Sequence, residues 1–389
     1  MDKINLSFLG TSLGYSISLF FIPLTILKAT NSALLVSITY ALDVIPYILF
    51  TPIIGWIGDK FNKKIVIIIG EAICLISSII LFFTPLTKEY AYLIISIGFI
   101  ISTSSSLHHS IFQSIIPSLY ATDTLPKANA NIATISSITG IISPIIISSA
   151  FSFSYLNENG IILIMIFCYI LSITSFLYIK YYHKKPEENE NLFKGLITSW
   201  RFLNNNNELK NYSYLFFFSN FGLKMVFVSL IWIYSNVFQM ENNQIAFNFI
   251  IIGVFSILGA KIAGLYIVPK FVARNVIITS LFLISMITLL LSLFKNSIYL
   301  TLLWGVVSLL SMIIVVSYFT FRQKNTPPEL LGRIVSITRL ISYLAIPPSA
   351  IISGYVVQHY NNEKIIYIIS GSIMLLSCVF FYHRLKVKT

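Results

Sequence analysis

Twelve apolar runs, each long enough to cross a lipid bilayer, constrain this sequence more than any other feature. A membrane-spanning helix needs about 20 predominantly apolar residues, and each run reaches or approaches that length. Only 10% of the 389 residues are charged, whereas a soluble domain usually has about 25%. The sequence therefore predicts an all-α polytopic membrane protein. Its expected spans are residues 6–27, 33–58, 65–85, 91–116, 128–153, 161–181, 212–238, 245–268, 276–294, 298–321, 334–357 and 365–382.

The basic residues indicate how these spans are oriented. With both termini in the cytoplasm, 19 of the 26 Lys and Arg residues fall in cytoplasmic segments and four fall in outer loops. Cytoplasmic loops of membrane proteins are enriched in Lys and Arg, and shifting the count by one span would break this separation. The net charge of +12 therefore reflects membrane topology and does not indicate nucleic-acid binding. We expect a multi-pass protein of the cell inner membrane with both termini in the cytoplasm.

One polar segment, residues 183–211, divides the spans into two groups of six. Within it, the apolar residues of 192–203 recur at helical spacing, which is typical of a helix lying in the membrane interface. The fifth and eleventh spans also form a weak internal repeat, with small and hydroxyl residues in their first turns. We therefore expect two six-helix halves, residues 1–182 and 212–389, joined by the cytoplasmic linker 183–211.

The link between the second and third spans, G-W-I-G-D-K-F-N-K-K, is the most distinctive stretch of the chain. It is so short that the two spans must be antiparallel neighbours. Its glycines allow another backbone to approach closely, and its acidic residue would face a neighbouring helix end beside several cations. The residues that we expect to act here are Gly55, Asp59, Lys60, Lys63 and Lys64.

Ionisable residues inside spans are energetically costly and usually face the interior of the helix bundle. At a rise of about 1.5 Å per residue, Lys224 lies close to the membrane midplane and Asp43 in the outer half. Both positions suit a central cavity, although Lys224 could instead be a structural counter-ion of a residue such as Asp43. The other ionisable residues in spans lie nearer the cytoplasmic end, where they could also snorkel or pair structurally: Glu71, His108, His109, Lys261 and Arg339.

The link at residues 55–64 resembles the loop signature of the major facilitator superfamily. In that family the aspartate is thought to bridge to the end of a helix in the other half, as a gate latch. Further stretches are similar to macrolide-efflux and enterobactin-exporter-like members. They are residues 30–34, 45–55, 113–117, 125–130, 328–333 and 347–348.

The chain departs from that branch at two places. Gly14 is followed by Tyr15, where the branch often has an aspartate, so the usual carboxylate of the first helix is missing. In the third span, Glu71 and Cys74 replace an Asp-x-x-Arg pattern. A coupling site therefore cannot be carried over from the branch residue by residue.

The resemblance implies the major facilitator fold and the export of a small molecule, a siderophore or metallophore or an antibiotic-like drug. Export would occur by alternating access and proton antiport. Asp59 and its neighbouring lysines would form the latch, and Asp43 and Glu71 are the proton-coupling candidates. Candidates for the substrate cavity are Lys224, Arg339, Tyr15, Tyr40 and Trp232.

Two other classes of function remain open on the sequence. An uptake carrier of the same fold is the main alternative, and a membrane-embedded enzyme or receptor is a remote one. The chain has no ATP-binding G-x-x-x-x-G-K-[ST] motif, and its three cysteines lack the spacing of a metal site. We expect no enzyme activity, cofactor or metal. The expected partners are a small-molecule substrate, protons and the lipid bilayer, and we expect the protein to be a monomer.

Overall fold

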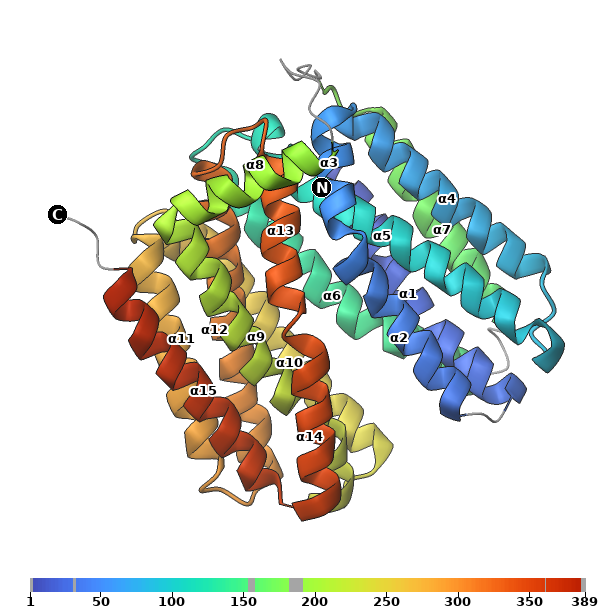
Figure 1. Ribbon diagram of the computed structural model, residues 1–389. Helices are drawn as coiled ribbons and strands as arrows, with labels where there is room; N and C mark the ends of the chain where they lie inside the picture. Colours follow the sequence, from blue (N-terminus) through green and yellow to red (C-terminus); the bar gives the residue numbers. More distant parts are fainter. Residues whose placement is uncertain (1–2, 31–32, 153–157, 182–191, 361, 386–389) are drawn as a thin grey trace. The chain divides into compact units, whose positions relative to one another are not determined.

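The structure is a computed structural model that describes residues 3–30, 33–152, 158–181, 192–360 and 362–385 (Figure 1). Every regular element within these ranges is a helix, which confirms the all-α prediction. Short 3-10 or π-helical turns occur at Lys88–Tyr90, Ile233–Val237 and Ala263–Ile267. The α-helices are α1 (Lys3–Thr30), α2 (Ala33–Leu49), α3 (Thr51–Lys60), α4 (Lys63–Phe83), α5 (Ala91–Leu119), α6 (Leu125–Ser152), α7 (Glu158–Leu177), α8 (Leu192–Asn205), α9 (Asn207–Trp232), α10 (Asn242–Ile262), α11 (Ala273–Leu291), α12 (Ser297–Lys324), α13 (Leu331–Tyr343), α14 (Ile346–Tyr360) and α15 (Glu363–Arg384).

Eleven helical segments among the described residues are long and apolar enough to cross a membrane. They correspond to eleven of the twelve predicted spans, with ends that differ by a few residues. The remaining predicted span, residues 33–58, is formed by α2 and α3 in succession. The structure therefore agrees with twelve spans when these two helices are counted together.

Proline explains why the second span is divided. Pro52 has no backbone N–H, so one helical hydrogen bond is missing at the junction between α2 and α3. The neighbouring bonds persist, because the Phe50 amide donates to the Pro46 carbonyl at 3.1 Å and the Ile54 amide to the Phe50 carbonyl at 2.9 Å. The junction is therefore a local kink within one span. Pro347 and Pro348 mark a similar interruption between α13 and α14.

The helices form two compact units. One comprises residues 1–119, 135–199 and 327–337, and is called unit 1 below; unit 2 comprises residues 120–134, 200–326 and 338–389. Unit 1 thus contains the beginning of α13, and unit 2 contains the beginning of α6. The division into halves at residues 182 and 212 stays a prediction.

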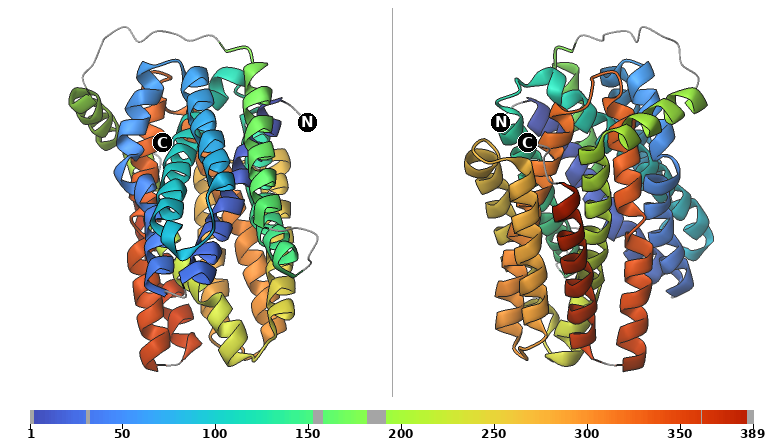
Figure 2. Two further views of the ribbon diagram at one scale, coloured as in Figure 1. Left: turned by 90° about the vertical axis from the view of Figure 1, so that its right-hand side faces the viewer. Right: turned by 60° about the vertical axis from the view of Figure 1, so that its left-hand side comes forward.

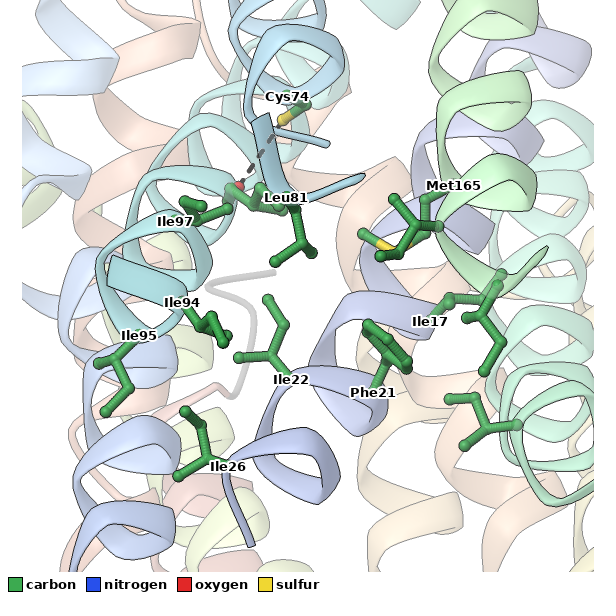
Figure 3. Close-up of a cluster of buried hydrophobic side chains, with 14 of the residues drawn as sticks. Ile17, Phe21, Ile22, Ile26, Cys74, Leu81, Ile94, Ile95, Ile97 and Met165 are labelled. Atoms are coloured by element: carbon green, nitrogen blue, oxygen red, sulfur yellow. Dashed lines mark hydrogen bonds between the residues drawn. The ribbon is translucent and has the colours of Figure 1, made fainter. Parts of the chain in front are cut away.

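Unit 1 is built around α1, α4, α5 and α7, which pack along one another. A large apolar cluster fills the space between these four helices (Figure 3). Its most enclosed side chains include Ile17, Phe21, Leu81, Ile94 and Met165, none more than 2% exposed. In unit 2, α10, α11, α12 and α15 pack in a similar way, and Figure 2 shows this unit from two further sides.

The stretch 192–203, expected to be helical, lies within α8. Asn206 ends it and begins α9, because its side chain accepts a hydrogen bond from the Leu209 amide. Ser199 and Leu203 are buried, whereas Ile197 and Trp200 are exposed. An exposed isoleucine and tryptophan agree with an interfacial position, and that position stays a prediction.

A glycine sets the distance between two helices of unit 2. A methyl group added at Gly259 on α10 would come within 2.7 Å of the Leu309 Cα on α12. That neighbour is backbone and cannot rotate away, so the two helices would have to separate.

We therefore expect Gly259→Ala to lower the thermal stability of the purified protein by about 1–3 kcal/mol through overpacking. Gly354→Ala is the matched control, because no atom lies within 4 Å of an added methyl group there. Thermal unfolding in detergent measures both variants. Equal melting temperatures for the two would contradict the close α10–α12 packing.

Candidate functional site

The carboxylate of Asp59 lies on the first turn of α13. One oxygen accepts a hydrogen bond from the Gly332 amide at 2.9 Å. The other accepts from the Arg333 amide at 2.9 Å and from the Arg333 Nε at 3.1 Å. The first amides of a helix have no partner within the helix and carry partial positive charge. Asp59 therefore binds α13 as an anion binds a helix N-terminus, with an arginine side chain added.

Two glycines make this approach possible. A methyl group at Gly55 would lie 2.7 Å from the Ser336 Cβ and 2.9 Å from the Arg333 Cα. A methyl group at Gly332 would occupy the place of the Asp59 carboxylate. Gly55 was predicted from the sequence, whereas Gly332 and Arg333 were not singled out as its partners. The signal was present, since both belong to the stretch 328–333 that resembles transporter loops.

The three predicted lysines have different surroundings. Lys63 lies 3.9 Å from the Asp59 carboxylate and donates to the Ser114 carbonyl at 3.4 Å. Lys64 donates to the carbonyl of Leu177, the last residue of α7, at 2.7 Å and to that of Ile179 just beyond it at 2.8 Å. Lys60 lies over the Trp56 ring, 4.6 Å from its centre. Of the three, only Lys63 is within ion-pair distance of Asp59.

Helix α8 also contacts this group of residues. Gly195 lies against Arg333, because a methyl group on it would meet the Arg333 Nη1, and the Trp56 ring is 3.4 Å from the same point. The linker helix therefore packs directly on the arginine that holds Asp59.

Glu71 on α4 is fully enclosed and shares a short contact with His108 on α5. Its Oε1 lies 2.5 Å from the His108 Nδ1 and accepts a hydrogen bond from the Thr11 hydroxyl at 2.8 Å. Both Glu71 and His108 are at most 1% exposed. The sequence placed both residues near the cytoplasmic end of adjacent spans, but did not pair them. Their shared depth on antiparallel neighbours was the available signal.

Two polar atoms of this pair remain without hydrogen-bond partners among the described residues. They are the Glu71 Oε2 and the His108 Nε2, and both are buried. Nearly all buried polar atoms in proteins are satisfied, and exceptions often mark a functional site. The Glu71–His108 pair can therefore bind a further proton donor or acceptor.

Asp43, the other coupling candidate, is buried in α2, also in unit 1. Its backbone carbonyl accepts from the Ser102 hydroxyl at 2.6 Å. Within the described part of the chain, its carboxylate has no ion pair. Unlike Glu71, it is therefore not tied to a titratable neighbour by a hydrogen bond that the structure shows.

The predicted cavity residues are distributed over several helices. Lys224 is half-buried on α9, with its Nζ 5.1 Å from the centre of the Phe227 ring. Arg339 lies over the Tyr343 ring at 5.9 Å, and Tyr15 lies 6.1 Å from the Tyr47 ring. Trp232 is half-buried at the end of α9. The side chain of Tyr40 lies outside the described residues.

A cavity of about 450 Å³ occurs in unit 2, between α10 and α12. Its lining is mainly apolar and includes Met240, Asn248, Ile251 and Thr301. None of the predicted cavity residues lines it. Sequence depth alone therefore did not find this space, because the lining residues of α10 and α12 carry no charge.

Residues 4–350 match the protein family described as the Major Facilitator Superfamily, whereas no curated protein matches the chain. The solved human organic anion transporter TETRAN has a TM-score of 0.79 and 14% identity, covering 97% of this chain and 98% of that one. A bacterial homologue of the iron transporter ferroportin, solved outward-facing, has a TM-score of 0.75 and 17% identity over 98% of both chains. A structure of such a homologue with soaked iron has a TM-score of 0.74 and 16% identity over 99% of both. At these identities the similarity shows the fold.

The Asp59 contact should contribute measurably to stability. Asp59→Asn keeps the size of the side chain but removes the charge and leaves one acceptor oxygen for two helix amides. We expect a loss of about 1–3 kcal/mol in unfolding free energy, measured by thermal unfolding in detergent. Asp123→Asn, at an exposed aspartate before α6, is the control. If Asp59→Asn unfolds at the same temperature as that control, the contact does not hold α13.

Proposed function

Because the chain belongs to the Major Facilitator Superfamily, we propose that it exports a small molecule by alternating access, in exchange for protons. Membership of this family makes the chain a membrane transporter and not an enzyme. Export, substrate class and proton coupling are the parts that we propose. The absence of an ATP-binding motif from the sequence supports an ion gradient as the driving force.

The observation that carries this proposal is the buried Glu71–His108 pair. An antiporter needs a group that holds a proton in one state and releases it in another. A carboxylate and an imidazole 2.5 Å apart can share one proton, and each keeps a second polar atom for exchange. Asp43 is the second candidate, because it is also buried in unit 1.

The Asp59 contact with α13 supports alternating access. The contact depends on the charge of Asp59 and involves three hydrogen bonds of 2.9 to 3.1 Å. A charge-dependent contact of this kind can be made in one state and broken in another. In the proposed cycle it is a latch on the cytoplasmic side of an inner-membrane protein with both termini inside.

The substrate class is proposed from chemistry and similarity together. A siderophore, a metallophore or an antibiotic-like drug agrees with the exporter branch that the loops resemble. Lys224 and Arg339 are the proposed contacts for an anionic group on such a molecule. The similar structures include an organic anion transporter and a homologue of an iron transporter, which agrees with an anionic or metal-chelating cargo. A monomer of two six-helix halves, 1–182 and 212–389, would carry out this cycle.

Everted membrane vesicles test the coupling directly. When ferric siderophores and macrolides are added in turn, an exported substrate should release protons from the acidified lumen. A pH-sensitive dye would report this release. We expect Glu71→Gln to abolish the proton movement while substrate exchange at equal pH survives. Glu89→Gln is the control, since Glu89 is exposed in the turn before α5.

Asp43→Asn separates the two candidates in the same assay. We expect it to reduce the proton movement less than Glu71→Gln does, because among the described residues Glu71 has a titratable hydrogen-bond partner and Asp43 does not. If both variants still move protons with substrate at the wild-type rate, neither residue carries the proton. A dye response of opposite sign would indicate uptake.

A further inference from the structure

We propose that a chain of three buried hydroxyl groups conducts protons to Glu71 from the beginning of α1. The groups belong to Ser7, Ser172 and Thr11, in that order. The proposal rests on the proposed function, because it assumes that Glu71 exchanges a proton. The new part is the route by which the proton reaches Glu71, which starts near the beginning of α1 in unit 1.

The distances form a continuous path. The hydroxyl oxygens of Ser7 and Ser172 are 3.0 Å apart, and those of Ser172 and Thr11 are 2.8 Å apart. Thr11 then donates to the Glu71 carboxylate at 2.8 Å. Ser7, Thr11 and Ser172 are all 0% exposed. Each step is therefore a hydrogen bond of ordinary length in a site shielded from bulk water.

The chemistry of hydroxyl groups suits this role. Each hydroxyl has one proton to donate and lone pairs to accept another. When a proton reaches Ser7, each oxygen in turn can accept one proton and release its own to the next. Thr11 delivers the last proton to the Glu71 carboxylate, which becomes a carboxylic acid. Each of the three hydroxyls returns to its starting state when it rotates about its C–O bond to its original orientation.

The two ends of the path have different surroundings, although both lie inside the protein. Ser7 lies four residues from the first described residue of α1, about 6 Å along the helix. In the other direction, α1 continues from Thr11 into the apolar cluster shown in Figure 3, which contains Ile17, Phe21 and Leu81. A proton can therefore approach Glu71 through the hydroxyls but not through that cluster.

Ser172 differs from most other hydroxyl residues of the same unit, whereas Thr11 also contacts the Ser7 carbonyl one turn earlier at 3.3 Å, a longer distance than its 2.8 Å contacts with Ser172 and Glu71. A serine or threonine in a helix commonly bonds to a carbonyl of its own preceding turn. Ser78 does so with Cys74, and Thr25 with Phe21. By contrast, the hydrogen bonds that the structure shows for Ser172 go to two side chains of another helix. If Ser172 only filled space between the helices, it would not need hydrogen bonds to two side chains on α1.

The titratable groups around Glu71 are few. His108 faces it from α5, and Cys74 lies one turn further along α4. Tyr169, on α7, belongs to the same buried cluster as Cys74. On α1 the contact is the Thr11 hydroxyl, which does not titrate. Among the described residues, Glu71 is therefore the first titratable group at the end of the hydroxyl path.

Time-resolved infrared spectroscopy after a pH jump tests the path without a substrate. The full-length protein would be reconstituted in phosphatidylcholine vesicles. The C=O band that disappears in Glu71→Gln identifies the protonated Glu71. Ser172→Ala interrupts the path without touching Glu71, and the lost oxygen leaves too little space for a water molecule. We expect the equilibrium titration of this band to be retained and its rate of appearance to fall at least about tenfold.

Ser78→Ala is the matched control, because Ser78 is equally buried and bonds only to the backbone in the structure. It should leave the rate at the wild-type value, and Ser7→Ala should slow it as Ser172→Ala does. A Glu71 band that titrates and appears at the wild-type rate in both path variants would overturn the hydroxyl path alone. If no Glu71 band titrates in the wild type, both the path and the proposed coupling fail.

Discussion

A charged group inside a bilayer must find its partners within the protein, because hydrocarbon offers no hydrogen bonds. Two of the buried carboxylates at the candidate site, Glu71 and Asp59, meet this requirement in different ways. Glu71 uses a threonine hydroxyl and an imidazole, whereas Asp59 uses the free amides of a helix end and a guanidinium. The first arrangement pairs a carboxylate with a titratable side chain, and the second pairs one with helix amides and an arginine.

Helix α4 connects these two arrangements. It begins at Lys63, the lysine nearest to Asp59, and carries Glu71 eight residues later, about 12 Å along its axis. Both sites belong to unit 1. In the proposed cycle, a change of protonation at Glu71 and a change in the latch therefore both affect α4, the latch through Lys63. Coupling between the Glu71 site and the Asp59 latch therefore requires no additional contacts beyond α4.

Hydropathy alone was sufficient to predict most of the fold, because lipid makes apolar length a direct requirement of each span. The spans and the linker helix α8 agree with the structure within a few residues. The kink at Phe50 was not predicted. Hydropathy averaged over a span does not register the one backbone N–H that Pro52 lacks. Pro46 and Pro52 were nevertheless visible in the sequence.

The candidate site could be predicted only in part. Asp59 and Gly55 stood out because their loop is short and charged, but their partners Gly332 and Arg333 are more than 270 residues away in the chain. Glu71 and His108 were each noted at a similar depth, whereas their pairing depends on how α4 and α5 are rotated about their axes. Depth along a helix can be counted from the sequence, and rotation is fixed by packing.

The central claim is that Glu71 and His108 hold one exchangeable proton together. Nitrogen NMR of histidine-labelled protein in lipid tests it most directly, because the chain has only five histidines. The account predicts that the His108 Nδ1 resonance shifts during the titration of Glu71, and that Glu71→Gln removes this shift. A His108 resonance that is unaffected by pH, or that is the same in Glu71→Gln, would contradict it.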